Sequence, residues 1–168
     1  MIFRFEMGKI KLLSNEGDTF ELDLEVAKKS EVIKEMLENC DDSSEEVPLS
    51  TISTYQLRKV VQWLEQHKND AVLDRLKGEE KDYNSDNISE WDKNFFSLSQ
   101  VEVFDLILAA NYLDIKDMLD ILAKTVANMM KGKTAREIRE TFNIECDLTE
   151  EEIEKIQNEN EWEMLSDK

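Results

Sequence analysis

The side chains best suited to catalysis are scarce in this chain of 168 residues. Its single histidine, His67, lies near the end of a predicted helix, where a protonated imidazole would complement the helix dipole. Cys40 and Cys146 are far apart, and neither has a basic or histidine neighbour in sequence that would favour a reactive thiolate. We therefore expect a structural role for His67 and packing roles for both cysteines.

Carboxylates are abundant, with 39 Asp and Glu, and paired carboxylates are the groups used in glycoside hydrolysis. In so acidic a chain, chance pairs are expected, and a solvated acidic face is the simpler interpretation. The loop 41–46 could hold Ca²⁺ weakly, but it lacks the glycine and the ligand spacing of an EF-hand. We expect no catalytic residue, cofactor or metal. An acidic-site hydrolase is an alternative that would need convergent carboxylates in a pocket.

The net charge of −18 limits the classes of partner. Such a surface repels phosphates, which argues against nucleic acid and anionic membrane, although an acidic mimic of DNA remains conceivable. No apolar run approaches the roughly 20 residues of a membrane span. Two cysteines without CxxC spacing are typical of reduced thiols, so we expect a cytoplasmic and nuclear protein. The length of the chain predicts one domain, or one domain with an appendage.

The first part of the chain predicts a β-hairpin over residues 9–24, because apolar and polar residues alternate on both sides of a turn at Gly17. A short helix opens at Ser30. A strand at Val47–Leu49 is predicted at a sheet edge, since Pro48 has no N–H to donate to a central ladder.

Helices are predicted over the rest. Ser53 and Ser99 begin capping boxes, in which a hydroxyl and a Gln or Glu three residues on satisfy backbone N–H groups. The segment 69–87 lacks apolar periodicity and is predicted to be a mobile acidic linker, after which Ser89 opens another helix. An early hairpin followed by helices predicts an α+β fold rather than an alternating α/β fold.

The end of the chain predicts two short helices opened by capping boxes at Thr134 and Thr149. Isolated helices of fewer than about 12–15 residues are marginal in water, and apolar residues are few here. From Glu145 onwards ten acidic residues face two lysines. This tail cannot build its own core, so it must lie on the preceding domain, lie on a partner, or be partly disordered.

Apolar residues are also concentrated in the central helix, Phe104–Ile115, and in the helix that follows it. The uncharged run from Leu106 to Tyr112 predicts a helix buried on most of its circumference, either inside an α domain or against another protein. Core packing is the simplest role for any one of these side chains. Together with the tail they would exceed the roughly 300–600 Å² of a monomer's largest apolar patch, which favours a partner helix or self-association.

Several segments occur in an order that is typical of one family. They are Lys9–Leu12, Gly17–Phe20, Val47–Leu49, Val60–Trp63, Trp91–Asp92, Leu106–Ile115, Lys124–Met129, Lys131–Thr134, Arg139–Ile144, Thr149–Glu152 and Glu159–Trp162. In order and spacing they resemble the S-phase-kinase-associated adaptors, which join F-box proteins to a cullin in SCF-type ubiquitin ligases. The match is uninterrupted across Leu106–Ile144.

The resemblance implies a BTB/POZ fold over residues 9–131, F-box-binding helices and a tail over 132–168, and an N-terminal extension over 1–8. It implies a non-catalytic adaptor of a ubiquitin ligase, with F-box proteins and a cullin as partners. Asn111 and Tyr112 would face the cullin. The residues implied to face the F-box are Val103, Phe104, Ile107, Leu119, Val126, Met130, Phe142, Ile144 and Trp162.

The chain departs from the family pattern in places. Ala135 replaces a proline that often follows the threonine of Lys131–Thr134, and the linker lacks the usual proline run. The alternative function is a structural scaffold outside any ligase, which self-associates through the same apolar groove. For the adaptor, a homodimer through the F-box groove is expected only when no F-box protein is bound.

Overall fold

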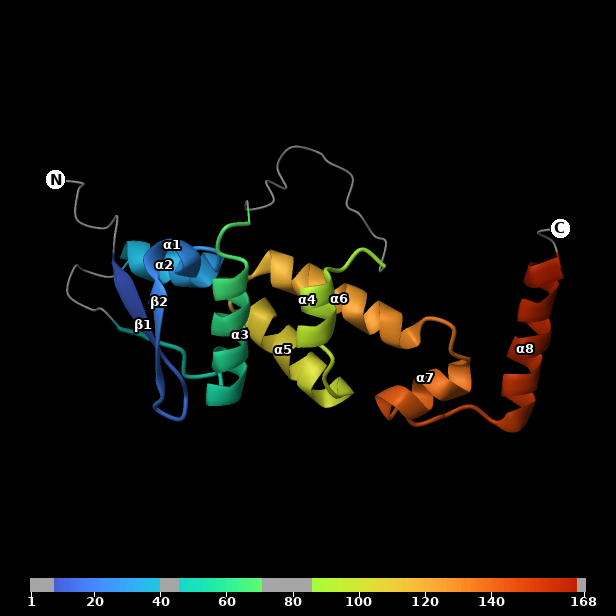
Figure 1. Ribbon diagram of the computed structural model, residues 1–168. Helices are drawn as coiled ribbons and strands as arrows, with labels where there is room; N and C mark the ends of the chain where they lie inside the picture. Colours follow the sequence, from blue (N-terminus) through green and yellow to red (C-terminus); the bar gives the residue numbers. More distant parts are fainter. Residues whose placement is uncertain (1–7, 40–45, 71–85, 166–168) are drawn as a thin grey trace. The chain divides into compact units, whose positions relative to one another are not determined.

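The computed structural model describes residues 8–39, 46–70 and 86–165, with side chains described as far as residue 159 (Figure 1). The chain divides into two compact units, residues 1–131 and residues 132–168. The acidic loop 41–46, except Glu46, and most of the linker predicted over 69–87 lie outside the described residues. Each unit is described by itself.

A three-stranded sheet begins the first unit, in the order β2-β1-β3. β1 (Lys9–Leu13) and β2 (Thr19–Asp23) form the predicted antiparallel hairpin, with Leu12 opposite Phe20. Gly17, with φ +92°, occupies the left-handed region that the turn requires. β3 (Glu46–Pro48) pairs parallel to β1, so the prediction of an edge strand containing Pro48 is confirmed. The hairpin was expected to reach residue 24, but Leu24 begins α1 (Leu24–Ala27).

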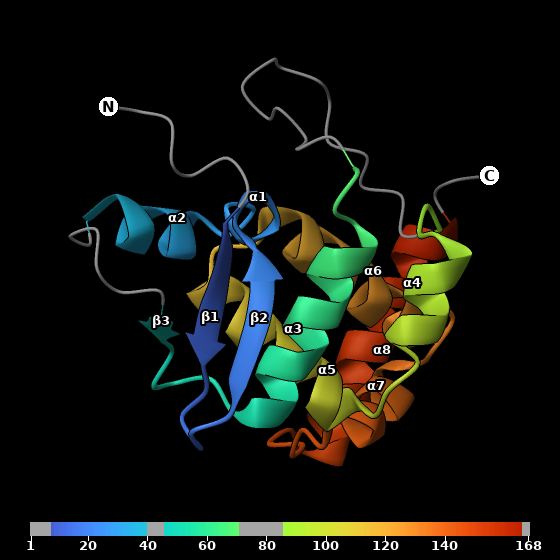
Figure 2. The same ribbon diagram turned by 60° about the vertical axis from the view of Figure 1, so that its left-hand side comes forward.

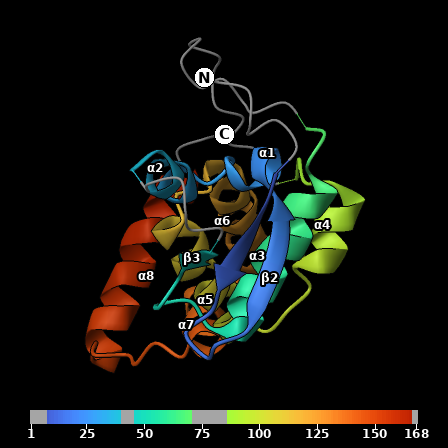
Figure 3. The same ribbon diagram turned by 90° about the vertical axis from the view of Figure 1, so that its left-hand side faces the viewer.

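The described residues of this unit form five further helices: α2 (Glu31–Asn39), α3 (Thr54–Gln66), α4 (Glu90–Phe95), α5 (Gln100–Tyr112) and α6 (Lys116–Met130). Both predicted capping boxes are present, at Ser53 with Gln56 and at Ser99 with Glu102. Figures 2 and 3 show α5 and α6 behind one face of the sheet, with α3 beside β2. The α+β class predicted from the sequence is confirmed.

The core lies between that face of the sheet and the helices. The core-facing side chains of the hairpin include Ile10, Leu12 and Leu22. The other face of the hairpin is exposed, and there 4.0 Å separates Nζ of Lys9 from Oε2 of Glu21. The sheet is therefore solvated on one side, as antiparallel hairpins commonly are. Each helix adds buried side chains to the same core, among them Ile33, Leu57, Leu64, Phe96, Leu106, Met118 and Leu122.

The central helix ends earlier than predicted. α5 stops at Tyr112, and the chain turns through Leu113 and Asp114 before α6 begins. Asp114 has φ 48°, and the Ser30 hydroxyl donates to the carbonyl of Leu113 at 2.5 Å. Leu113 and Ile115 are both buried. The apolar run thus continues across a tight turn, which sequence periodicity did not reveal.

A buried carboxylate joins α3 to α4. Asp92, 2% exposed, accepts from the indole N–H of Trp63 at 3.0 Å and from the hydroxyl of Ser89 at 2.7 Å. His67 Nε2 lies 3.0 Å from the same carboxylate, and its Nδ1 lies 2.6 Å from Asp70. The imidazole also stacks on Trp63. The structural role expected for His67 is therefore to link the end of α3 to the start of α4.

We predict that Asp92→Ala lowers the free energy of unfolding by about 2–3 kcal/mol, because buried donors lose their charged acceptor. Chemical denaturation of the two proteins measures the difference. Glu90→Ala is the matched control on the same helix, because Glu90 makes only an exposed pair with Lys93 at 3.1 Å. That control is expected to change stability by less than about 0.5 kcal/mol. Equal losses would contradict the role given to Asp92.

The second unit contains α7 (Ala135–Phe142) and α8 (Glu150–Leu165), each opened by its predicted capping box. Asn143 ends α7 in the left-handed conformation at φ 50°, and the N–H of Ile144 donates to the carbonyl of Arg139 at 2.9 Å. None of the described side chains of residues 132–159 is buried. Within this part of the chain, the prediction that the tail lacks its own core is confirmed.

Candidate partner-binding surfaces

Helix α5 has two unlike faces. Val103, Leu106, Ala109 and Ala110 are buried against the rest of the first unit. On the opposite side Val101, Phe104, Leu108 and Tyr112 are exposed, by 65%, 38%, 65% and 39% respectively. Their spacing of three, four and four residues places them in one stripe along the helix. We call these four side chains the α5 stripe.

The residues expected to face the cullin lie at the end of this stripe. Asn111 and Tyr112 are both exposed in the last turn of α5, just before the turn at Asp114. Phe104 is seven residues before Asn111 and so shares its side of the helix. By position, Phe104 groups with the residues expected to face the cullin.

The residues of the first unit expected to face the F-box differ in accessibility. Val103 is 0% exposed and belongs to the core. Its side chain can therefore support a surface but cannot contact a partner in this conformation. Ile107, Leu119 and Val126 are half-buried and pack against the core, whereas Met130 is 38% exposed. On α6 the residues 119, 126 and 130 follow one helical face.

Sequence reasoning missed Val101 and Leu108, the two most exposed residues of the α5 stripe. A fully apolar run gives no periodicity from which to tell the buried face from the exposed one. Leu106, Leu108 and Ala110 therefore look alike in sequence, although only Leu108 is exposed. Which face is buried is decided by the packing of α3 and α6 against α5.

The start of α5 is attached to α3 by a charged hydrogen bond. The hydroxyl of Tyr55, which is 39% exposed, donates to the carboxylate of Glu102 at 2.7 Å. The Ser99 hydroxyl donates to the same carboxylate at 2.6 Å. Hydrogen bonds from Ser99, and next from Tyr55, lower the pKa of Glu102 to about 2. Burial, and next the bond to Glu102, raise the pKa of Tyr55 to about 12.

A pH dependence of stability follows from Glu102. Because its folded-state pKa is depressed, its contribution is present above its ordinary value of 4.5 and is lost as the pH falls towards 2. We predict that the Glu102→Gln variant loses less stability than the unaltered protein as the pH falls from 4.5 to about 2. The capping box of α5 should remain, because Gln56 forms the same kind of box at the start of α3. Denaturation midpoints measured across this pH range test the difference. An equal loss of stability at acidic pH in the unaltered protein and in the variant would contradict this prediction.

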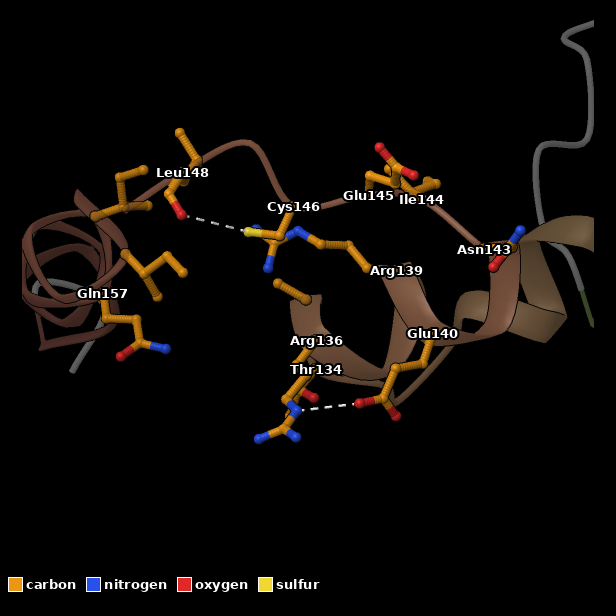
Figure 4. Close-up of a pocket in the computed structure, with 13 residues that line it drawn as sticks. Thr134, Arg136, Arg139, Glu140, Asn143, Ile144, Glu145, Cys146, Leu148 and Gln157 are labelled. Atoms are coloured by element: carbon orange, nitrogen blue, oxygen red, sulfur yellow. Dashed lines mark hydrogen bonds and ion pairs between the residues drawn. The ribbon is translucent and has the colours of Figure 1, made fainter. Parts of the chain in front are cut away.

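In the second unit, Ile144 is 55% exposed and Phe142 is half-buried. The side chain of Trp162 lies outside the described residues. Residues of α7, α8 and the connecting segment line a hollow of about 880 Å³ (Figure 4). Its apolar lining comes mainly from Ile144, Leu148, Ile153 and Ile156.

The described residues offer little to metal or covalent chemistry. No group of three or more His, Cys, Asp or Glu among them is placed to hold a metal ion. Cys146 is exposed and free, so the packing role predicted for it is wrong, whereas Cys40 lies outside the described residues. Within the same ranges, no helix combines the length and apolarity that a membrane crossing requires. What the described residues present instead is exposed apolar surface.

A small sheet packed on helical hairpins, followed by further helices, defines a BTB/POZ-type protein with an appended helical unit. Two family models match the chain: the Skp1 family tetramerisation domain over residues 8–69 and the Skp1 family dimerisation domain over residues 116–163. The chain belongs to the Skp1 family.

Curated relatives match almost from end to end. The suppressor of kinetochore protein 1 of Schizosaccharomyces pombe is 46% identical over 159 residues, which cover 93% of this chain and 98% of the relative. Proteins named E3 ubiquitin ligase complex SCF subunit sconC from Arthroderma benhamiae and Arthroderma otae are 45% and 44% identical. Each of those matches covers 92% of this chain and 94% of the relative.

Proposed function

We propose that this protein is the adaptor subunit of an SCF-type ubiquitin ligase, holding an F-box protein on one surface and a cullin on another. The observation that carries the proposal is a well-packed first unit that leaves the α5 stripe exposed, together with a second unit whose described side chains are all unburied. The names of the relatives support the same function, since two of them are called SCF subunits.

The cullin-binding surface is proposed at the exposed end of the α5 stripe. Tyr112 offers a large apolar ring with a polar tip, a residue type enriched in interfaces. Asn111 adjoins it with an amide able both to donate and to accept hydrogen bonds. The buried face of α5 holds both residues on a rigid helix, so little conformational entropy is lost on binding.

The F-box-binding surface is proposed on the hairpin of α5 and α6 and in the second unit. Ile107, Leu119, Val126 and Met130 supply partly exposed apolar area on the helical hairpin. Phe142 and Ile144 supply it on and just after α7, and Trp162 is proposed to join them. Burying one such side chain fully is worth roughly 1.5–3 kcal/mol, so a partner helix would gain enough to order the second unit.

The adaptor is proposed to act without catalytic groups of its own. It would fix the distance between a substrate held by the F-box protein and the ubiquitin-conjugating machinery held by the cullin, in the cytoplasm and nucleus. Rigid positioning of this kind raises the effective concentration of two bound partners without any chemical step by the adaptor.

We predict that Tyr112→Lys weakens cullin binding at least tenfold, about 1.4 kcal/mol, while F-box binding is kept. Phe142→Asp is expected to do the reverse, because a carboxylate would replace an apolar contact. Calorimetric titration of each variant with a cullin N-terminal domain and with an F-box domain measures both effects.

Two controls carry the same charge changes elsewhere. Gln66→Lys and Gln62→Glu, both on α3, replace exposed residues outside the proposed surfaces, and both variants should bind both partners normally. Loss of both partners in a variant that keeps its fold would refute the division into two surfaces.

A homodimer is proposed for the protein without an F-box partner, through the same apolar surface. Sedimentation velocity across a concentration series should then show dimers that dissociate when an F-box domain is added, because the two occupants compete. Met130→Glu should weaken the dimer in the same experiment. Dimers that persist with the F-box domain bound would favour the scaffold function instead.

A further inference from the structure

Arg139 is a half-buried cation for which the described residues provide no counter-ion. It lies in the last turn of α7, one turn before Asn143, on the side of the helix that also carries Phe142. Its guanidinium makes no ion pair and no side-chain hydrogen bond within the described part of the chain. Partial burial of an unpaired charge is unfavourable unless something compensates it.

The hollow that Arg139 lines is mainly apolar, although Glu140, Glu145 and Gln157 also line it. Arg139 lines the hollow of the second unit together with Ile144, Leu148, Ile153 and Ile156, and Figure 4 shows its side chain extended towards Cys146. A guanidinium held among apolar side chains is less hydrated than one in bulk water. A carboxylate placed there would therefore be bound more strongly than at an open surface.

Arg136 provides the contrast on the same helix. Its Nε donates to the carboxylate of Glu140 at 3.1 Å, and its side chain is 87% exposed. Arg136 is thus neutralised within its own helix, although it touches the same hollow. Of the two arginines of α7, Arg139 is the one left to interact with another molecule.

The acidity of the second unit makes this cation more selective. Residues 132–168 contain twelve Asp and Glu against five Lys and Arg. Acidic partners are repelled by this unit in general, so a carboxylate on a partner is tolerated only where a positive charge faces it. The favourable dipole at the end of α7 explains a basic residue in this turn, but it does not require the side chain to be half-buried.

We propose that Arg139 selects F-box partners that place an acidic side chain beside an apolar anchor. The anchor would fill the hollow against Ile144 and Ile153, and the carboxylate would accept hydrogen bonds from the Arg139 guanidinium. Arginine suits this role because its planar donors match a carboxylate in a bidentate pair. The inference rests on the proposed function, since the occupant is the F-box segment.

The test uses the full chain and an F-box domain that co-purifies with it. Arg139→Gln is expected to weaken binding at least about tenfold, the size of a lost charge-assisted hydrogen bond. Arg136→Gln removes the same charge from the same helix and should change the affinity less than about threefold. Arg139→Lys should be intermediate, because it keeps the charge without the bidentate geometry.

A charge swap identifies the partner's acidic residue. Each Asp and Glu of the F-box domain is changed to Lys in turn and paired with Arg139→Glu. One of these changes should restore most of the affinity lost by Arg139→Glu alone, and the others should not. Unfolding curves of the free variants show whether Arg139 acts on stability instead.

The outcomes separate this inference from the proposed function. If no F-box domain binds even the unaltered chain, the adaptor function fails and the selective role of Arg139, which depends on it, fails as well. If F-box domains bind well but Arg139→Gln and Arg136→Gln weaken them equally, the adaptor function stands and the selective role of Arg139 is refuted. Rescue by one charge swap supports both.

Discussion

The burial of one side of α5 is the constraint on which the rest of the molecule depends. Val103, Leu106, Ala109 and Ala110 anchor this helix in the core, and α3 and α6 pack around it. Because that side is fixed, the opposite side must face outwards, and its apolar residues become a rigid surface. The bond between Tyr55 and Glu102 secures the start of the same helix. Core packing and the proposed partner binding therefore use one helix and cannot vary independently.

The two units solve the problem of stability differently. The first unit closes a core around the sheet and uses a buried carboxylate, Asp92, to tie α4 to α3. The second unit has capped helices but buries none of its described side chains, so local hydrogen bonds rather than packing hold its helices. A capping box contributes about 1 kcal/mol, which is small beside the burial of several apolar side chains. In the proposed adaptor, the apolar side chains that the second unit leaves unburied would be available to a partner.

Much of the fold could be predicted from the sequence because its signals are local. The hairpin follows from alternation around Gly17, the edge strand from Pro48, and the helix starts from four capping boxes, and all of these are present. The misjudged points are junctions. Leu24 begins a helix, and α5 ends at Tyr112 although the apolar run continues to Ile115. In both places a side chain is buried for tertiary reasons, and hydrophobicity alone does not say whether the backbone is helix, strand or turn.

The sequence by itself determined the α+β class, the family, the helix starts and the lack of core residues in the tail, since each is encoded within a few neighbouring residues or in overall composition. Tertiary structure alone decided which apolar residues are accessible. It buried Val103, exposed Val101 and Leu108, and left Arg139 half-buried without a described counter-ion while Arg136 found Glu140. The physical reason is that accessibility and charge pairing depend on neighbours distant in the chain, and a uniformly apolar helix does not show in sequence which side those neighbours will cover.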